Sequence, residues 1–225
     1  MCAIQRMNEF QIKQSEPTVT TDTAPETNSN ASSPKNENTI AEIIRFTIIA
    51  LIIVVPIRMF IAQPFIVSGA SMEDSFQNGE YLIVDQLTYQ FESPKRGEVV
   101  IFRYPRDASK YFIKRVVGVP GDTITINGAE VTIKNQAHPE GITLAEPYIA
   151  SMSENTFLTE ELGEDEYFVM GDNRDQSSDS RMWGILHEDK IVGRAFLRLF
   201  PIGSIASFPG AYDSPVGATE FNNPE

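Results

Sequence analysis

An uncharged apolar stretch near the N-terminus is the strongest constraint on how this chain of 225 residues can fold. Residues 46–57 carry no charge, and apolar residues continue on both sides of them. About 20 residues of helix, at roughly 1.5 Å each, cover the roughly 30 Å hydrocarbon layer of a bilayer. Arg45 and Arg58 stand near the two ends, where long basic side chains can reach lipid headgroups. We therefore predict a transmembrane helix at residues 40–64, with an amphipathic or core helix as the alternative.

The segments at the two ends of the chain are polar. Residues 14–39 are rich in Ser, Thr, Asn, Glu and Pro and have no apolar period. Such a segment cannot bury enough surface to offset the entropy that ordering costs. We predict a disordered tail at residues 1–39 and a polar C-terminal tail at residues 208–225.

Between the apolar stretch and the C-terminal tail, the sequence consists of short runs rich in β-branched and aromatic residues. Residues 81–84, 99–102 and 111–117 are examples, and such composition is typical of strands. Asn127-Gly128 separates two further runs and is typical of a tight hairpin turn. No long helical period appears, so we predict a single all-β domain at residues 65–207.

Composition argues against several classes of function. The net charge is -13, and most acidic residues lie in the C-terminal two-thirds, whereas a nucleic-acid partner would favour a basic face. The only cysteine is Cys2, which disfavours a cysteine protease. The two histidines, His138 and His187, lie in turn-like segments, which disfavours a Ser-His-Asp triad. No cluster of Cys, His or carboxylates has the spacing of a zinc site, so we predict no metal and no cofactor.

Two residues are candidates for nucleophile and base. Ser71 follows Gly69 and Ala70, small residues that expose a side chain and a neighbouring N–H. Lys114 lies on a predicted strand face between Phe112 and an apolar valine. Removal from water would lower the pKa of this lysine and make a neutral amine available as a base. The alternatives are a turn serine and an exposed edge-strand lysine.

A polar loop at residues 171–184 follows a predicted strand at residues 167–170. It is dense in Asp, Asn, Ser and Arg, a composition that favours Asx turns and ion pairs. A calcium-binding loop is the alternative, but Arg174 stands where an oxygen ligand would be needed.

Four segments together resemble type I signal peptidases. Ser71-Met72 resembles the nucleophile box of that family, and residues 96–102 resemble its second conserved strand. Residues 114–122 resemble its lysine box, and residues 171–181 match its Gly-Asp-Asn-x-x-x-Ser-x-Asp-Ser-Arg box. The resemblance covers roughly residues 40–205, and the order and spacing of the boxes agree with it.

The resemblance implies a fold of coiled antiparallel β-sheets and a Ser/Lys dyad. Ser71 would attack the scissile carbonyl, Lys114 would take its proton, and the Ser177 hydroxyl would orient the lysine amine. The backbone N–H of Ser71 would contribute to the oxyanion hole. The expected structural ion pairs are Arg115–Asp172 and Asp179–Arg181.

The resemblance also implies a location and a substrate. The family is anchored in the plasma (inner) membrane by one span, with its tail in the cytoplasm and its catalytic domain outside. It removes signal peptides from exported preproteins without a metal or cofactor. The substrate would lie as an extended strand beside residues 65–67 and 112–113. The expected pocket residues are Val67, Met72, Phe76 and Phe112 for the residue at -1 from the cut, Val67, Leu82, Ile101 and Ile113 for the residue at -3, and Phe65 beside them.

The sequence departs from the family pattern in the nucleophile box. Asp74 and Ser75 replace the usual Pro-Thr, and Gly69 stands where some members have a serine that serves the oxyanion hole. Two alternatives remain open at this point. One is a Ser/Lys autoprotease similar to the LexA-type repressor domains, and the other is a catalytically inactive β-domain that binds exported proteins.

Overall fold

Two antiparallel sheets make up most of the regular secondary structure among the described residues, and the all-β character predicted from the sequence is confirmed. The computed structural model describes residues 3–6, 39–56, 62–149 and 155–212. The larger sheet runs in the order β1 (Ala3–Arg6), β2 (Ala62–Ser68), β3 (Tyr81–Asp85), β12 (Ile191–Phe200), β4 (Val99–Tyr104), β5 (Asp107–Gly118), β10 (Glu166–Met170) and β11 (Leu186–His187), with β13 (Ala206–Ser207) paired to β12. The smaller sheet runs in the order β8 (Ile142–Thr143), β7 (Glu130–Lys134), β6 (Thr123–Asn127) and β9 (Phe157–Glu161).

The larger sheet closes into a ring. Strand β1 pairs with β2 on one side and with β5 on the other, so β1, β2, β3, β12, β4 and β5 follow one another without an open edge. Each of these six strands contributes to one buried apolar group, which we call the interior cluster. It consists of Ile4, Phe65, Val67, Met72, Phe76, Leu82, Val84, Val99, Ile101, Ile113 and Ala195. Since side chains of a strand alternate between faces, the strand residues of this cluster share the inner face of the ring, and Met72 and Phe76 reach it from the turn after β2.

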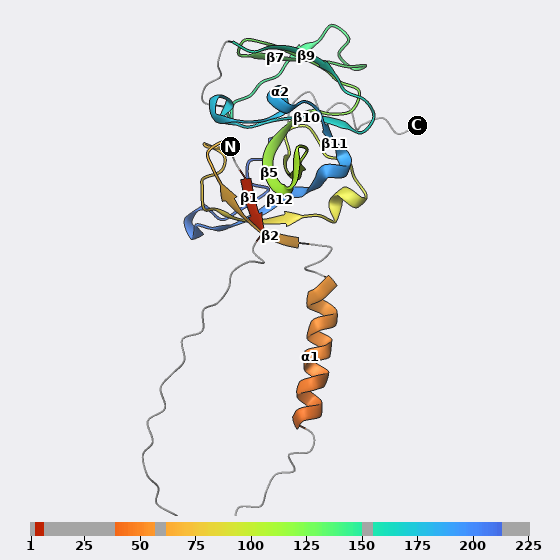
Figure 1. Ribbon diagram of the computed structural model, residues 1–225, viewed down its shortest axis with the longest axis vertical. Helices are drawn as coiled ribbons and strands as arrows, with labels where there is room; N and C mark the ends of the chain where they lie inside the picture. Colours follow the sequence, from red (N-terminus) through yellow and green to blue (C-terminus); the bar gives the residue numbers. More distant parts are fainter. Residues whose placement is uncertain (1–2, 7–38, 57–61, 150–154, 213–225) are drawn as a thin grey trace, which may run out of the picture.

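The smaller sheet caps one end of the molecule and is drawn above the ring in Figure 1. Its hairpin of β6 and β7 lies where the sequence predicts one, but Asn127 pairs with Glu130, so the loop consists of Gly128 and Ala129, and Gly128 has a φ of 62°. Such a positive φ is the reason glycine suits this kind of turn. A second buried group, with Ile124, Ile133 and Phe168 among its members, joins this sheet to β10.

Helices are few among the described residues. They are α1 (Thr39–Pro56), the short α2 (Ser180–Trp183), and the 3-10 turns η3 (Thr88–Gln90), η4 (Arg174–Gln176), η5 (Glu188–Lys190) and η6 (Ile202–Ser204). The large apolar side chains of α1, such as Phe46 and Ile52, are exposed. Within the part of the chain that the structure describes, no helix combines the length and apolarity that a membrane crossing needs.

The structure differs from the predicted limits of the transmembrane segment. The prediction extended a helix to residue 64, but α1 ends at Pro56 and β2 begins at Ala62. Pro64 pairs with Ile83 in the sheet. Proline lacks the N–H that a helix interior needs and disfavours helical angles in the residue before it. Residues 57–61 of the predicted segment lie outside the described residues.

The two predicted tails are also shorter than expected. Ala3–Arg6 form strand β1, although the prediction assigned residues 1–39 to a disordered tail. Residues 208–212 lie against the domain, because Phe208 donates its N–H to the Phe196 carbonyl and Tyr212 donates to Gly97. Both exceptions depend on pairing with distant segments, which local composition does not reveal. Residues 1–2, 7–38 and 213–225 lie outside the described residues.

Candidate active site

Ser71 and Lys114 lie side by side in the interior of the domain. Ser71 follows the end of β2, and Lys114 lies in β5 opposite Val100 of β4. The Nζ of Lys114 is 2.6 Å from the Oγ of Ser71, and it donates a second hydrogen bond of 2.8 Å to the Ile113 carbonyl. Both side chains are fully buried. The arrangement brings an amine within proton-transfer distance of a hydroxyl.

The surroundings of Lys114 are largely apolar. Residues 112–118 of β5 are all buried, and their side chains alternate between the two faces, so Lys114 shares a face with Phe112 and Val116. The Phe112 ring lies 5.5 Å from the Lys114 Nζ. Burial disfavours the charged ammonium relative to the neutral amine, although a ring face near the Nζ offsets part of this effect.

The loop at residues 171–181 holds the turn that carries Ser71. Asn173 donates its backbone N–H to the Ser71 carbonyl at 3.1 Å, and its side-chain amide donates to the Ala70 carbonyl at 3.1 Å. Gly171 lies between the two segments. A Cβ added there would lie closer than 3.0 Å to both the Ser71 carbonyl oxygen and the Ser177 Oγ. Only glycine therefore lets the loop approach the nucleophile turn so closely.

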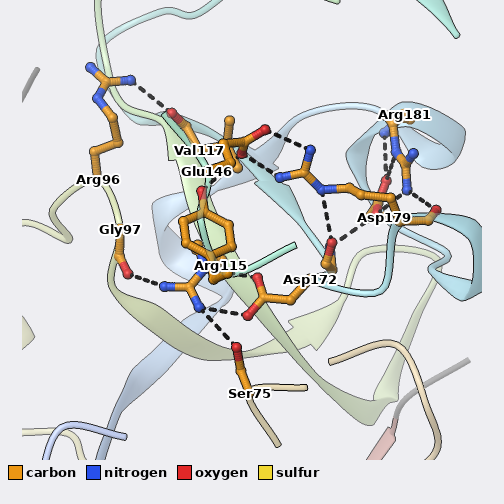
Figure 2. Close-up of polar contacts among 12 residues, drawn as sticks. Ser75, Arg96, Gly97, Arg115, Val117, Glu146, Asp172, Asp179 and Arg181 are labelled. Carbon is orange, nitrogen blue, oxygen red and sulfur yellow. Dashed lines mark hydrogen bonds and ion pairs between the residues drawn. The ribbon is translucent and has the colours of Figure 1, made fainter. Parts of the chain in front are cut away.

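Arg115, next to Lys114, is the centre of a buried polar network (Figure 2). Its Nε and Nη2 donate to the two carboxylate oxygens of Asp172 at 2.8 and 2.6 Å, and Nη1 donates to the Gly97 carbonyl at 2.8 Å. Its guanidinium carbon lies 3.8 Å from the centre of the Tyr148 ring. A planar guanidinium has donors enough to join several segments at once.

A second ion pair fixes the far end of the same loop. Arg181 donates from Nε and Nη2 to the two oxygens of Asp179, both at 2.8 Å. The carboxylate also accepts the N–H of Gly171 at 3.1 Å, which ties the two ends of the loop together. Burial alone would raise the pKa of Asp179, but the hydrogen bonds and charge of Arg181 outweigh it and lower the pKa.

Ser177 is buried in this loop, beside Gly171. The structure thus brings it into the group that contains Ser71. Its role in orienting the Lys114 amine stays a prediction, as does the role of the Ser71 N–H in an oxyanion hole.

Seven of the eight predicted pocket residues come together in the interior cluster, and one does not. The seven are Phe65, Val67, Met72, Phe76, Leu82, Ile101 and Ile113. Phe112 belongs to a different buried group, where its ring stacks on Tyr104 with 4.5 Å between centroids. The reason is strand alternation, because neighbouring Phe112 and Ile113 must point to opposite faces of β5.

The unusual nucleophile box adopts an unusual backbone. Asp74 has a φ of 81°, in the left-handed region that few residues other than glycine adopt, with Asp and Asn among the better tolerated. Proline could not take this conformation, because its ring fixes φ near about -65°. Ser75 lies 3.4 Å from Arg115 through its Oγ, so the altered turn also reaches the buried network (Figure 2).

Several residues of the site were not predicted individually. Gly171 and Asn173 belong to the matched box at residues 171–181. A glycine there could have indicated a close approach of two segments, and an asparagine could have indicated a hydrogen-bonding side chain. Glu146, which forms a buried ion pair with Arg174, and Tyr148 lie in an irregular segment that offers no such signal.

Neither histidine nor a metal cluster takes part in this arrangement. His187 is exposed on β11, opposite Glu166. Searching residues 3–6, 39–56, 62–149 and 155–212 finds no group of three or more His, Cys, Asp and Glu side chains suited to a metal ion.

Comparison with known proteins assigns the chain to a family. The family described as "Signal peptidase, peptidase S26" matches residues 40–200. The Synechocystis protein named "Probable signal peptidase I-2" is 36% identical over 183 residues, which cover 79% of this chain and 80% of that protein. Signal peptidase I of Leptolyngbya laminosa is 33% identical over 183 residues, with 78% and 87% covered. Signal peptidase I T of Bacillus subtilis is 33% identical over 194 residues, with 80% and 95% covered.

These matches identify the chain as a peptidase. Within that class, it belongs to the signal peptidase family, peptidase S26, and its relatives are signal peptidases of type I. The resemblance found from the sequence boxes is therefore confirmed.

Substitution of Gly171 tests the close approach of the two loops. We expect Gly171→Ala to lower activity by roughly a hundredfold, because a small displacement of a nucleophile can cost that much. Overpacking should also lower the free energy of unfolding by about 1–3 kcal/mol. Gly203→Ala is the matched control, because nothing lies within 4 Å of its added Cβ. Peptide cleavage and urea unfolding measure both effects, and equal behaviour of the two variants would contradict the packing described.

Asp179→Asn tests the second ion pair through its pH dependence. Because the folded-state pKa of Asp179 is lowered, its ionisation stabilises the fold above the unfolded pKa of about 3.9. That contribution is lost as the pH falls through the folded-state pKa. At pH 7 we expect the variant to be less stable by about 3–5 kcal/mol, since Arg181 loses its charged partner. Urea unfolding should show the difference shrinking below about pH 4, and a constant difference would refute the assignment.

Proposed function

We propose that this chain is a membrane-bound serine endopeptidase that removes N-terminal signal peptides from exported preproteins. Its family membership supports this substrate class, since its relatives are named signal peptidase I. The observation that carries the proposal is the 2.6 Å separation between the Lys114 Nζ and the Ser71 Oγ, with both groups buried. A solvated lysine beside a surface serine would have no comparable function.

The proposed reaction is acyl transfer through an acyl-enzyme. The Ser71 Oγ attacks the carbonyl carbon at the cut while its proton passes to the neutral Lys114 amine. The tetrahedral oxyanion is stabilised by the Ser71 N–H. Collapse breaks the C–N bond, and the Lys114 ammonium returns its proton to the leaving amine. Water, activated by the same lysine, then hydrolyses the ester and releases Ser71.

Two features of the site favour this use of Lys114. Burial favours the neutral amine, which alone can act as a base. The hydrogen bond from the amine to the Ile113 carbonyl orients the nitrogen while it contacts Ser71. The proposed role of Ser177 is to complete this orientation from the loop that also contacts the Ser71 turn.

The interior cluster supports a preference for small side chains next to the cut. Met72 directly follows Ser71, and Phe76 lies five positions after it. Both would line the -1 pocket together with Val67, whereas Leu82, Ile101 and Ile113 would line the -3 pocket. All are bulky and buried, so the space left for a substrate side chain is shallow.

The proposed membrane attachment is through α1 and the apolar residues that follow it. The exposed Ile, Leu, Val and Phe side chains of α1 would be costly to leave in water. Apolar residues continue to residue 61 on both sides of Arg58, which would lengthen the span. We propose a single span in the plasma (inner) membrane, with the N-terminal tail in the cytoplasm and the catalytic domain outside.

The dyad is tested by three substitutions. Ser71→Ala, Lys114→Ala and Lys114→Arg should each lower preprotein cleavage by at least about a thousandfold with the fold retained, as for other catalytic groups that act as a unit. Arginine fails because a guanidinium keeps its proton at any working pH. His187→Ala is the control and should keep most activity. Circular dichroism checks the fold, and substantial turnover by Lys114→Arg would exclude lysine as the base. Cleavage of an added preprotein also separates this function from an autoprotease or a binding domain.

Specificity is tested on the substrate. Leucine in place of alanine at -1 or -3 of a good substrate should slow cleavage by roughly tenfold to a hundredfold, because a larger side chain must force a packed wall apart. The kcat/KM values of the original peptide and of its leucine variants at -1 and at -3 measure this effect. Unchanged rates would mean that access, not pocket shape, sets the specificity.

Topology is tested by proteolysis. In intact cells, or spheroplasts where an outer membrane is present, added protease should reach residues 66–225 and leave the N-terminal tail protected. Tags at the two ends, detected on blots, report which part is cut. Digestion of the tail alone would reverse the proposed orientation.

A further inference from the structure

The N-terminal strand β1 occupies a slot that the rest of the sheet leaves between β2 and β5. Ala3, Ile4 and Gln5 pair with Ser68, Val67 and Ile66 of β2, and the first two of them also pair with β5. Figure 1 shows β1 in red next to β2. Residues 7–38 separate β1 from every other described element.

The slot has the width of one strand, because a single strand pairs with both of its walls. Without β1, the facing edges of β2 and β5 would each present unpaired backbone groups, and such edges readily accept an added strand. These edges lead to Ser71 and Lys114, since β2 ends three residues before Ser71 and Lys114 follows Phe112 by two residues.

The Ile4 side chain fills the interior at the same place. It is only 3% exposed and packs in the interior cluster with Val67, Met72 and Leu82. Those residues belong to the walls of the proposed -1 and -3 pockets. A substrate strand could not pair with the edges of β2 and β5 while β1 occupies them.

The direction of β1 is opposite to that of a substrate. The residues at -3 and -1 lead up to the cut at Ser71, so a substrate held beside β2 runs in the same direction as β2. Strand β1 is antiparallel to β2, and its Ala3 lies opposite Ser68. The strand therefore fills the slot without offering a bond in the productive direction.

We propose that the N-terminal segment is a built-in, uncleaved competitor that closes the cleft of its own chain. The proposal rests on the function proposed above for this cleft. It also couples activity to membrane insertion. If α1 spans a bilayer, residues 3–6 and the catalytic domain lie on opposite sides, so β1 cannot stay in the slot. Insertion opens the cleft, and the chain before insertion is blocked.

The connecting segment is long enough for this contact within one chain. Helix α1 has 18 residues and a length of about 27 Å, at roughly 1.5 Å per residue. Residues 7–38, when extended, reach on the order of 100 Å. This length is enough to join α1 to a strand β1 that occupies the slot when no membrane lies between them.

The first test compares full-length variants in detergent, where the tail and the catalytic domain share one aqueous phase. Ile4→Asp should lower the KM for a signal-peptide substrate by roughly tenfold or more, since burial of one isoleucine contributes about that much to binding, with kcat within about twofold. Ile12→Asp is the matched control outside β1 and should behave as the wild type. In liposomes with α1 inserted and the catalytic domain outside, all three proteins should have the same KM. Equal KM values in detergent would overturn the proposal.

The second test needs no catalysis. In a Cys2→Ser background, Gln5→Cys and Ile66→Cys occupy paired positions of β1 and β2 and should form a disulfide within one chain, because opposed residues of an antiparallel pair lie close together. Ile12→Cys with Ile66→Cys is the control and should not cross-link. The locked protein should be inactive until a reductant is added.

The two tests separate the two proposals. If the protein cross-links but cleaves no preprotein, β1 does occupy the slot and the proposed function is refuted. An absence of cross-linking, or cross-linking only between two chains, would refute closure by the chain's own tail. Intact mass after prolonged incubation should also show an uncut N-terminus, and cleavage within residues 1–12 would contradict the reversed strand.

Discussion

The contact of the Lys114 amine with the Ser71 hydroxyl, away from water, imposes the requirements that the surrounding structure meets. A buried amine must be held near its partner by segments that do not move, because a small displacement removes the proton-transfer geometry. Lys114 lies in the middle of a paired strand, so its position is fixed by β4 on one side. Ser71 lies in a turn, which by itself offers no such rigidity, and it therefore depends on neighbours to hold it.

Those neighbours come from the polar loop after β10. The backbone and side chain of Asn173 hold two carbonyls of the Ser71 turn, while Gly171 permits the approach. Arg115 reinforces the loop from the other face of the lysine strand through Asp172. Buried ion pairs contribute little net stability, because desolvation offsets most of the attraction. Their value here lies in geometry, since one guanidinium links Gly97, Asp172 and the carbonyl of Gly210.

The sequence alone predicted the fold class and the residues whose side chains have recognisable chemistry. Strand composition and the Asn127-Gly128 turn predicted an all-β domain, and the long boxes identified the family. Strand alternation could have separated Phe112 from Ile113, but the pocket assignment followed the resemblance instead. Strand β1 and the packed residues 208–212 could not be predicted, because their order comes from edges and side chains far away in sequence. The same holds for Tyr148, whose ring covers a guanidinium more than thirty positions before it.

The left-handed backbone at Asp74 bears on how such a box can change during evolution. A proline there would require a φ roughly 145° away from the 81° observed. Exchange of Asp74 for the family's usual proline is therefore not a single conservative step, because the turn must first adopt another conformation. The two versions of the nucleophile turn are separate solutions, each dependent on its own neighbours. Substrate preferences measured on members with the proline would then not transfer to this chain, even where the serine equivalent to Ser71 occupies the same place.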